Sequence, residues 1–278
     1  RDRRHLDART LVVPLLALAT VGLNIIWPLV HGQARAALTI AGVLTFFGAS
    51  ALHAWQTQTR RFTTLLLLAI APLAFAAEVI GVHTQVPFGH YAYGTQIGFS
   101  AMGVPLIIPL AWIMMLYPCT VIATELSDRW LVRSALGAWL MASWDLYLDP
   151  QMIHEDYWHW IDGNGQTTLT IPLTNFAGWF AVSFLFLGLL CKGLEAGPIS
   201  SDSRGKVTNT TSHFMQMVTA LRTHSPKILM LWVWLGSFIA NVLPFSPYLN
   251  RPMVALTGMI GMGIVLVPWS WQAWSQRS

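Results

Sequence analysis

The sequence predicts an all-α integral membrane protein, built as a polytopic bundle of about eight transmembrane helices with both termini in the cytoplasm. Two observations lead to this fold class. Hydrophobic residues make up 54% of the 278 residues and charged residues only 10%, whereas soluble domains carry about 25% charged residues. The apolar runs also lack the strict alternation of a membrane β-strand, so helices are expected to cross the bilayer. We expect residues 1–278 to form a single transmembrane domain.

The individual helices follow from the lengths of the uncharged runs. A helix needs about 20 mostly apolar residues to cross the hydrocarbon core of a bilayer. The runs without Asp, Glu, Lys or Arg include residues 10–34, 36–59, 79–124, 228–250 and 252–276. In chain order, the expected spans are residues 11–30, 36–56, 62–82, 103–124, 132–149, 172–192, 228–245 and 253–274.

The distribution of Lys and Arg predicts the orientation of these spans. With the N-terminus in the cytoplasm, 14 of the 16 Lys and Arg residues fall on inner segments, and only Arg35 and Arg251 fall on outer loops. Because inner loops are enriched in Lys and Arg, we expect a multi-pass protein of the cytoplasmic (plasma) membrane. Anionic lipid headgroups explain the net charge of +4, so no nucleic-acid partner is expected. The Ser-, Thr- and Gly-rich inner loop 195–226 is predicted to be flexible, with a surface helix near residues 212–222.

Three acidic residues, Glu78, Asp145 and Asp149, lie inside or at the end of predicted spans. A charge in the membrane costs about 2.5–3.5 kcal/mol on insertion scales, and such residues usually serve function. Asp145 and Asp149 are four residues apart, so they share one face of a helix. Pro150 is expected to end that helix, which would put Asp149 at a C-terminus whose dipole disfavours an anion. We therefore expect at least one acid to keep its proton near neutral pH, as a general acid does. The alternative is structural: Asp149 as a cap and Asp145 as an interhelical hydrogen-bond partner.

Polar and aromatic residues gather near the outer ends of the spans. The predicted topology places Glu78 in the outer half of the third span and the loops 86–94 and 151–165 outside. Residues 171–179 enter the sixth span from the same side. Three helix ends and two loops therefore predict one site near the outer surface. For single aromatic residues, an interfacial belt of Trp and Tyr is the alternative. The candidate substrate-binding residues are His90, Tyr91, Tyr93, Trp144, Tyr147, Trp158, Trp160, Asn175 and Trp179.

Residue spacing excludes several classes of membrane enzyme. A di-iron hydroxylase needs closely spaced His pairs, but no two His residues of this chain are closer than five positions apart. No Gly-rich nucleotide fingerprint or P-loop is present. Intramembrane prenyltransferases hold a diphosphate through Mg²⁺ on Asp-rich motifs, yet a second such motif and nearby basic residues are missing here. The sequence therefore predicts acid chemistry on a nonpolar substrate, without a metal or other cofactor.

Five short motifs resemble one known family. They are EVIG (78–81), PFGHYAY (87–93), WDLYLDPQM (144–152), YWHW (157–160) and IPLTNFAGW (171–179). In this order and spacing they resemble the CruF-type carotenoid hydratase family of carotenoid biosynthesis proteins. That family includes γ-carotene and lycopene hydratases and haloarchaeal bisanhydrobacterioruberin hydratases. The motifs cover residues 78–179, and the flanking spans match in number and hydrophobicity.

The resemblance implies hydration of the terminal C1–C2 double bond of an acyclic carotenoid ψ-end, which gives a tertiary alcohol at C1. A carboxylic acid would protonate C2, and Trp and Tyr faces would stabilise the resulting C1 cation. Asp145 or Glu78 is the expected acid, while Asp149, His90 or Asn175 would position the attacking water. The expected partners are the carotenoid, membrane lipids and other enzymes of the carotenoid pathway.

Two other function classes stay open at this point. The first is a proton-coupled lipid transporter, in which Glu78, Asp145 and Asp149 would form a relay. It would require polar residues across the full depth of the membrane, and the sequence offers few. The second is a non-catalytic carotenoid-binding membrane subunit, which would explain the aromatic residues but not the three acids.

Overall fold

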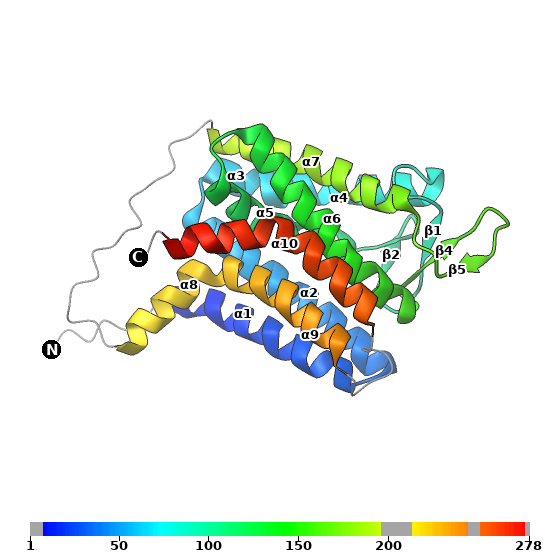
Figure 1. The fold of residues 1–278 in the computed structure, drawn as a ribbon, viewed down its shortest axis with the longest axis horizontal. Coiled ribbons are helices and arrows are strands. Elements are labelled where there is room, and N and C mark those ends of the chain that lie inside the picture. Colours follow the sequence, from blue (N-terminus) through cyan, green and yellow to red (C-terminus); the bar gives the residue numbers. More distant parts are fainter. Residues whose placement is uncertain (1–7, 196–212, 244–250, 276–278) are drawn as a thin grey trace.

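The computed structural model of the chain describes residues 8–195, 213–243 and 251–275 (Figure 1). Long helices run side by side and form a bundle, with short strands gathered at one end. The helical elements are α1 (Ala8–Ile26), η1 (Trp27–Leu29), α2 (Gly32–Thr57), α3 (Arg60–Thr64), η2 (Leu65–Ala69), α4 (Ile70–Thr84), α5 (Ile108–Leu126), α6 (Trp130–His154), α7 (Leu173–Glu195), α8 (His213–Leu231), η4 (Trp232–Gly236), α9 (Ser237–Val242) and α10 (Pro252–Ser275). The strands are β1 (Tyr91–Tyr93), β2 (Ser100–Ala101), β3 (Val104–Pro105), β4 (Trp158–Ile161) and β5 (Thr167–Thr168).

Within the described residues, seven helical stretches are long and apolar enough to cross a membrane. They are Thr10–Leu29, Gly32–Thr57, Arg60–Thr84, Ile108–Leu126, Leu173–Gly193, Met215–Val242 and Pro252–Ser275. Each overlaps one of the predicted spans. The prediction of a helical membrane protein is therefore confirmed, whereas the count of eight spans and the cytoplasmic position of both termini stay predictions.

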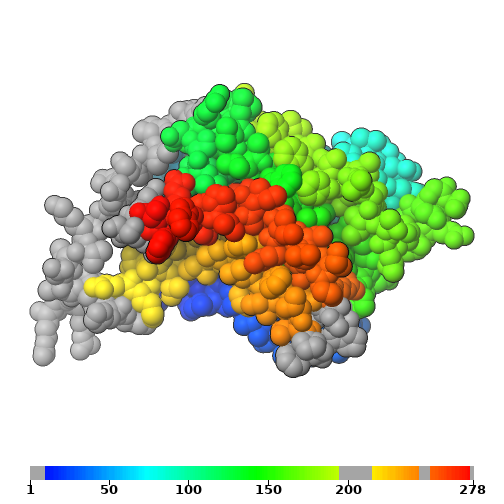
Figure 2. Space-filling model, viewed as in Figure 1, coloured from blue at the N-terminus to red at the C-terminus, as the bar shows by residue number. Residues whose placement is uncertain are grey.

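Helix α6 corresponds to the predicted fifth span but is not among these seven stretches. It carries Arg133, Asp145 and Asp149. It packs against α7, α10 and α5, and Figure 2 shows α6, α7 and α10 side by side on one face of the molecule. About half of its residues are buried. Because α6 faces protein on several sides, its polar side chains are shielded from lipid.

The predicted end of this helix is wrong. Helix α6 continues through Pro150 to His154, so Asp149 lies inside the helix and the argument from the helix C-terminus does not apply to it. A proline normally breaks a helix because it lacks an N–H and crowds the preceding turn. Here tertiary contacts hold the turn in place. Arg251 Nη1 donates to the Pro150 carbonyl at 2.6 Å, and three side chains donate to Asp149.

Part of the predicted flexible loop 195–226 is helical. Residues 196–212 lie outside the described residues, but α8 begins at His213 and continues through η4 and α9 to Val242. The predicted surface helix is therefore the first part of a much longer helix. It forms because α8 packs against α1, α2 and α5 and buries Val218. These long-range contacts outweigh the polar composition of the segment.

Two small antiparallel sheets at one end of the bundle add to the predicted all-α architecture (Figure 1). Strand β1 pairs with β4, so that Tyr91 lies opposite Trp160 and Tyr93 opposite Trp158. Strand β4 also pairs with β5, and β2 pairs with β3. Because side chains alternate along a strand, the four aromatic residues share one face. The β1–β4 ribbon contacts α4 and α6, so it places these rings beside the helices that carry the acids.

Candidate active site

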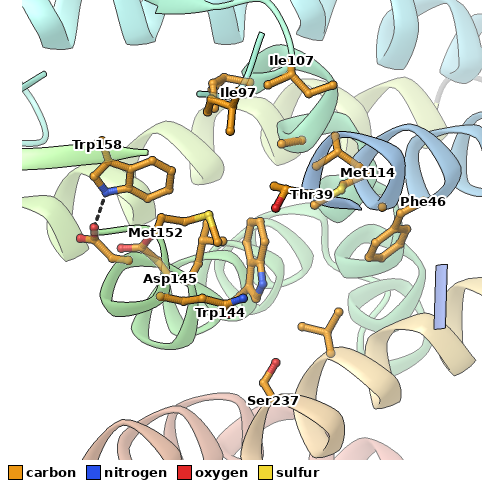
Figure 3. A pocket seen from close by; sticks show the side chains of 18 of the residues that line it. Thr39, Phe46, Ile97, Ile107, Met114, Trp144, Asp145, Met152, Trp158 and Ser237 are labelled. Atoms are coloured by element: carbon orange, nitrogen blue, oxygen red, sulfur yellow. Dashed lines mark hydrogen bonds between the residues drawn. The ribbon is translucent and has the colours of Figure 1, made fainter. Parts of the chain in front are cut away.

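A cavity of about 240 Å³ lies within the bundle, next to the β1–β4 ribbon (Figure 3). Its wall combines side chains from α1, α2, α4, α5, α6, α7, the helix formed by α8, η4 and α9, and the loops. The predicted acids Glu78, Asp145 and Asp149 all line this one cavity. Their exposed fractions are 3%, 4% and 1%. The predicted topology placed these three acids only at a similar depth in the membrane, and the structure brings them together in one cavity.

Glu78 on α4 is held by three hydrogen-bond donors. Trp112 Nε1 donates to Oε1 at 2.8 Å, and the hydroxyls of Tyr91 and Tyr93 donate to Oε2 at 2.7 and 2.8 Å. Burial and, next in size, the nearby Glu78 carboxyl raise the pKa of both loop tyrosines well above the usual range of a phenol. Both tyrosines therefore keep their protons and can serve as donors.

Asp145 and Asp149 share a single amide group. Asn175, near the start of α7, donates through Nδ2 to Asp145 Oδ2 at 2.6 Å and to Asp149 Oδ2 at 2.9 Å. Asp149 also accepts from Trp158 Nε1 at 2.5 Å, the dashed bond in Figure 3, and from Trp160 Nε1 at 3.2 Å. Asp145 Oδ1, in contrast, is buried and has no hydrogen-bond partner among the described residues. The two aspartates thus differ sharply in how many donors they accept from.

Indole rings form part of the wall beside the acids. Trp112 and Trp179 stack with centroids 4.3 Å apart and planes 9° from parallel, and Trp144 meets Trp179 edge-on at 6.0 Å. The face of an indole carries negative charge density and attracts cations. The wall can therefore stabilise positive charge that forms on a bound apolar molecule.

Two glycines allow the loop 86–94 to approach the helices closely. A Cβ at Gly178 would lie 2.9 Å from the Pro87 carbonyl oxygen, and a Cβ at Gly81 would lie 2.8 Å from the Phe88 ring. Real Cβ atoms essentially never make such short contacts. The missing side chains let the loop lie between α4 and α7, and this brings the β1 tyrosines onto the α4 acid.

Most of the candidate residues line the cavity. They are Glu78, Tyr91, Tyr93, Trp144, Asp145, Asp149, Trp158, Trp160, Asn175 and Trp179. His90 and Tyr147 do not. The backbone carbonyl of His90 accepts from the Ile161 N–H at 2.8 Å within the ribbon. Tyr147 lies two positions from Asp145, hence on another face of the helix; its ring packs where a Gly258 Cβ would be, and its hydroxyl donates to the Ala255 carbonyl at 3.3 Å.

Trp112 is the main site residue that the sequence argument missed. It lies in an apolar span with no polar neighbour in the sequence to mark it. A buried indole N–H usually finds a hydrogen-bond partner, so a Trp in the middle of a span was the available signal. Four polar residues that were not predicted as site residues, Thr20, Asn24, Ser237 and Asn241, line the part of the cavity formed by α1 and α9.

Among the residues that the structure describes, no group of three or more His, Cys, Asp or Glu residues is placed to hold a metal ion. The acids of the cavity instead accept hydrogen bonds from Trp, Tyr and Asn. The prediction that the protein works without metal or cofactor stays a prediction.

The sequence matches the family described as carotenoid biosynthesis protein over residues 38–243. It is also 22% identical over 210 residues to a bisanhydrobacterioruberin hydratase of Haloarcula japonica, and the alignment covers 72% of this chain and 62% of that relative. No solved structure matches the chain. The matched range contains all three acids and every residue that donates to them. The chain belongs to the carotenoid biosynthesis protein family.

Proposed function

We propose that this protein adds water across the terminal C1–C2 double bond of an acyclic carotenoid ψ-end, of the lycopene or γ-carotene type, and forms a tertiary alcohol at C1. Family membership supports a carotenoid substrate, and the similar Haloarcula protein is named a hydratase. One observation carries the proposal: three buried acids line a single cavity whose wall also contains stacked indoles.

Hydration of a terminal double bond requires an acid and a site that tolerates a cation. A carboxylic acid on the cavity wall gives its proton to C2, and the π electrons form the new C–H bond, which leaves a tertiary cation at C1. The faces of Trp112, Trp144 and Trp179 lower the energy of that cation. A water molecule then bonds to C1 and releases a proton to a carboxylate, which restores the acid. The balance is one water consumed, with no oxidant or reductant.

The size of the cavity fits one end of a carotenoid better than the whole molecule. At about 240 Å³, it is smaller than the roughly 300–1,000 Å³ of a site that encloses a drug-sized ligand. In our proposal only the ψ-end enters the cavity, while the polyene lies among the apolar helices and lipid. Membrane lipids and other carotenoid-pathway enzymes are then the expected neighbours.

We also infer the orientation and the membrane from the Lys and Arg distribution. Both termini lie in the cytoplasm and the acids lie near the outer surface of the plasma membrane. In this arrangement water reaches the cavity from the outer side, close to the β1–β4 ribbon.

Expression in a lycopene-producing host tests the proposed function directly. Extracted pigment is expected to gain the mass of one water, or of two when both ends react, and a host with the empty vector provides the baseline. Pigment of unchanged mass in the presence of folded protein would refute hydration. It would instead favour the transporter or the carotenoid-binding subunit.

A further inference from the structure

The three acids of the cavity differ in their hydrogen bonding. Both oxygens of Glu78 accept, from one indole and two phenols. Both oxygens of Asp149 also accept, from two indoles and the Asn175 amide. Asp145 accepts a single bond at Oδ2, and its buried Oδ1 has no partner in the described part of the chain.

Hydrogen bonds from several donors stabilise a carboxylate as an anion, and bonds to charged groups are stronger than bonds between neutral groups. A buried carboxylate oxygen without a donor is costly, because nothing replaces the water it has lost. The hydrogen-bond donors around Glu78 and Asp149 therefore favour the ionised carboxylate form of both residues. The single donor at Asp145 suits a neutral carboxylic acid.

From this difference, and resting on the hydratase function proposed above, we propose separate roles for the three acids. Asp145 holds the proton on Oδ1 and gives it to C2 of the substrate. Glu78 stays a carboxylate throughout and stabilises the C1 cation. Trp112 is a positioning residue that holds the Glu78 carboxylate through its Nε1–H.

The proton balance is closed. Transfer from Asp145 Oδ1 to C2 forms the C2–H bond, breaks the O–H bond and leaves Asp145 as a carboxylate next to the Asn175 amide. Water then forms the C1–O bond, and one of its protons returns to Asp145. Asp149 keeps its three donors through the cycle, and its negative charge favours return of the proton to its neighbour.

Trp112 couples this charge arrangement to the aromatic wall. Its Nε1–H reaches Glu78 Oε1 at 2.8 Å, and its ring stacks on Trp179 at 4.3 Å. The stack fixes the plane of the indole, which fixes the direction of the N–H. Loss of the Trp112 N–H donor should therefore weaken the stabilisation of the C1 cation by Glu78, while the proton stays on Asp145.

An infrared experiment on the purified full-length protein in detergent tests the assignment independently of turnover. A protonated carboxylic acid gives a carbonyl stretch that shifts when water is replaced by D₂O. At neutral pH this band is expected in the wild type, in Glu78→Gln and in Asp149→Asn, and it is expected to disappear in Asp145→Asn. A band that survives in Asp145→Asn and disappears in Glu78→Gln would overturn the assignment.

Hydration of lycopene, measured per folded molecule, provides the second test. Asp145→Asn should lower the rate by about 10²–10⁴-fold, as loss of a general acid does. Trp112→Phe should lower it by about 10–100-fold, the loss of one bond to a charged group, and Trp112→His, which restores a ring N–H, should recover part of the rate. Wild-type rates in both Trp112 variants would refute its positioning role.

Glu125→Gln is the matched control for Glu78→Gln. Glu125 also accepts from an indole, Trp269 Nε1 at 2.8 Å, but it lies outside the cavity lining and pairs with Lys227. Its variant is expected to keep the wild-type rate, whereas Glu78→Gln should lose at least tenfold. A wild type that hydrates no acyclic carotenoid would overturn the proposed function itself. An active wild type with equal rates in these two variants would overturn only the role of Glu78.

Discussion

Asn175→Leu is the substitution that most directly probes the paired aspartates. Leu has the same number and branching of side-chain heavy atoms as Asn but no amide, so the change removes the bonds at 2.6 and 2.9 Å to Asp145 and Asp149 and keeps the shape of the side chain. A bond to a charged carboxylate contributes about 1.5–3 kcal/mol, and one to a neutral acid about 0.5–1.5 kcal/mol. Their loss should therefore cost about 2–4 kcal/mol.

If that cost falls on the transition state, the rate of hydration should drop about 30- to 1,000-fold, because each 1.36 kcal/mol is a factor of ten. The assay is the initial rate of water addition to lycopene by the full chain, divided by the amount of folded, carotenoid-bound protein. Retained carotenoid binding would show that the loss lies in chemistry and not in assembly of the cavity.

Asn241→Leu serves as the comparison, since it makes the same chemical change elsewhere in the cavity lining. The Asn241 amide donates to the Ser237 carbonyl at 2.8 Å, and within the described residues it makes no hydrogen bond to any of the three acids. Its loss should cost about 1 kcal/mol and lower the rate less than tenfold. Equal rates for Asn175→Leu and Asn241→Leu would refute the view that the shared amide organises the acids.

Three further predictions follow from the site and the topology. Hydroxylation should proceed without oxygen and in the presence of a metal chelator, and growth in ¹⁸O-labelled water should label the product; an unlabelled alcohol would exclude hydration. Membrane-impermeant cysteine reagents should reach residues 85–102 and 155–171 only from outside and residues 196–212 only from inside. Labelling of both groups from one side would contradict the orientation. Gly178→Ala should lower both folded yield and activity, because its Cβ would lie 2.9 Å from the Pro87 carbonyl oxygen. Gly163→Ala should have no effect, because a Cβ there would have nothing within 4 Å. Equal yields of the two variants would show that the close approach of Gly178 to Pro87 is unimportant.

Hydrophobic runs made the helical spans predictable, because a segment in lipid must be apolar along its own length and satisfy its own backbone. The same local rule singled out Glu78, Asp145 and Asp149, since acids in apolar runs are conspicuous. Predictions from local sequence were wrong at Pro150, where a helix end was expected, and in α8, where a flexible loop was expected. In both places long-range packing supplied the contacts that the local sequence lacks.

Trp112 shows why the site itself could not be completed from the sequence. It bonds to Glu78 across 34 positions, and Asn175 reaches Asp145 across 30. Nothing in the residues next to either donor indicates its partner. The β1–β4 ribbon, which aligns Tyr91 with Trp160, likewise joins two loops that are far apart in the chain.

By itself, the sequence determined that this is a helical membrane protein and which acids lie in its apolar interior, because both depend on the composition of single segments. Only the tertiary structure decided which oxygen of each acid meets which donor, and that Asp145 Oδ1 meets none among the described residues. The reason is physical. The cost of a buried carboxylate is set by the few groups within hydrogen-bond distance, and here those groups come from α5, α7 and two loops that meet α4 and α6 only when the bundle has packed.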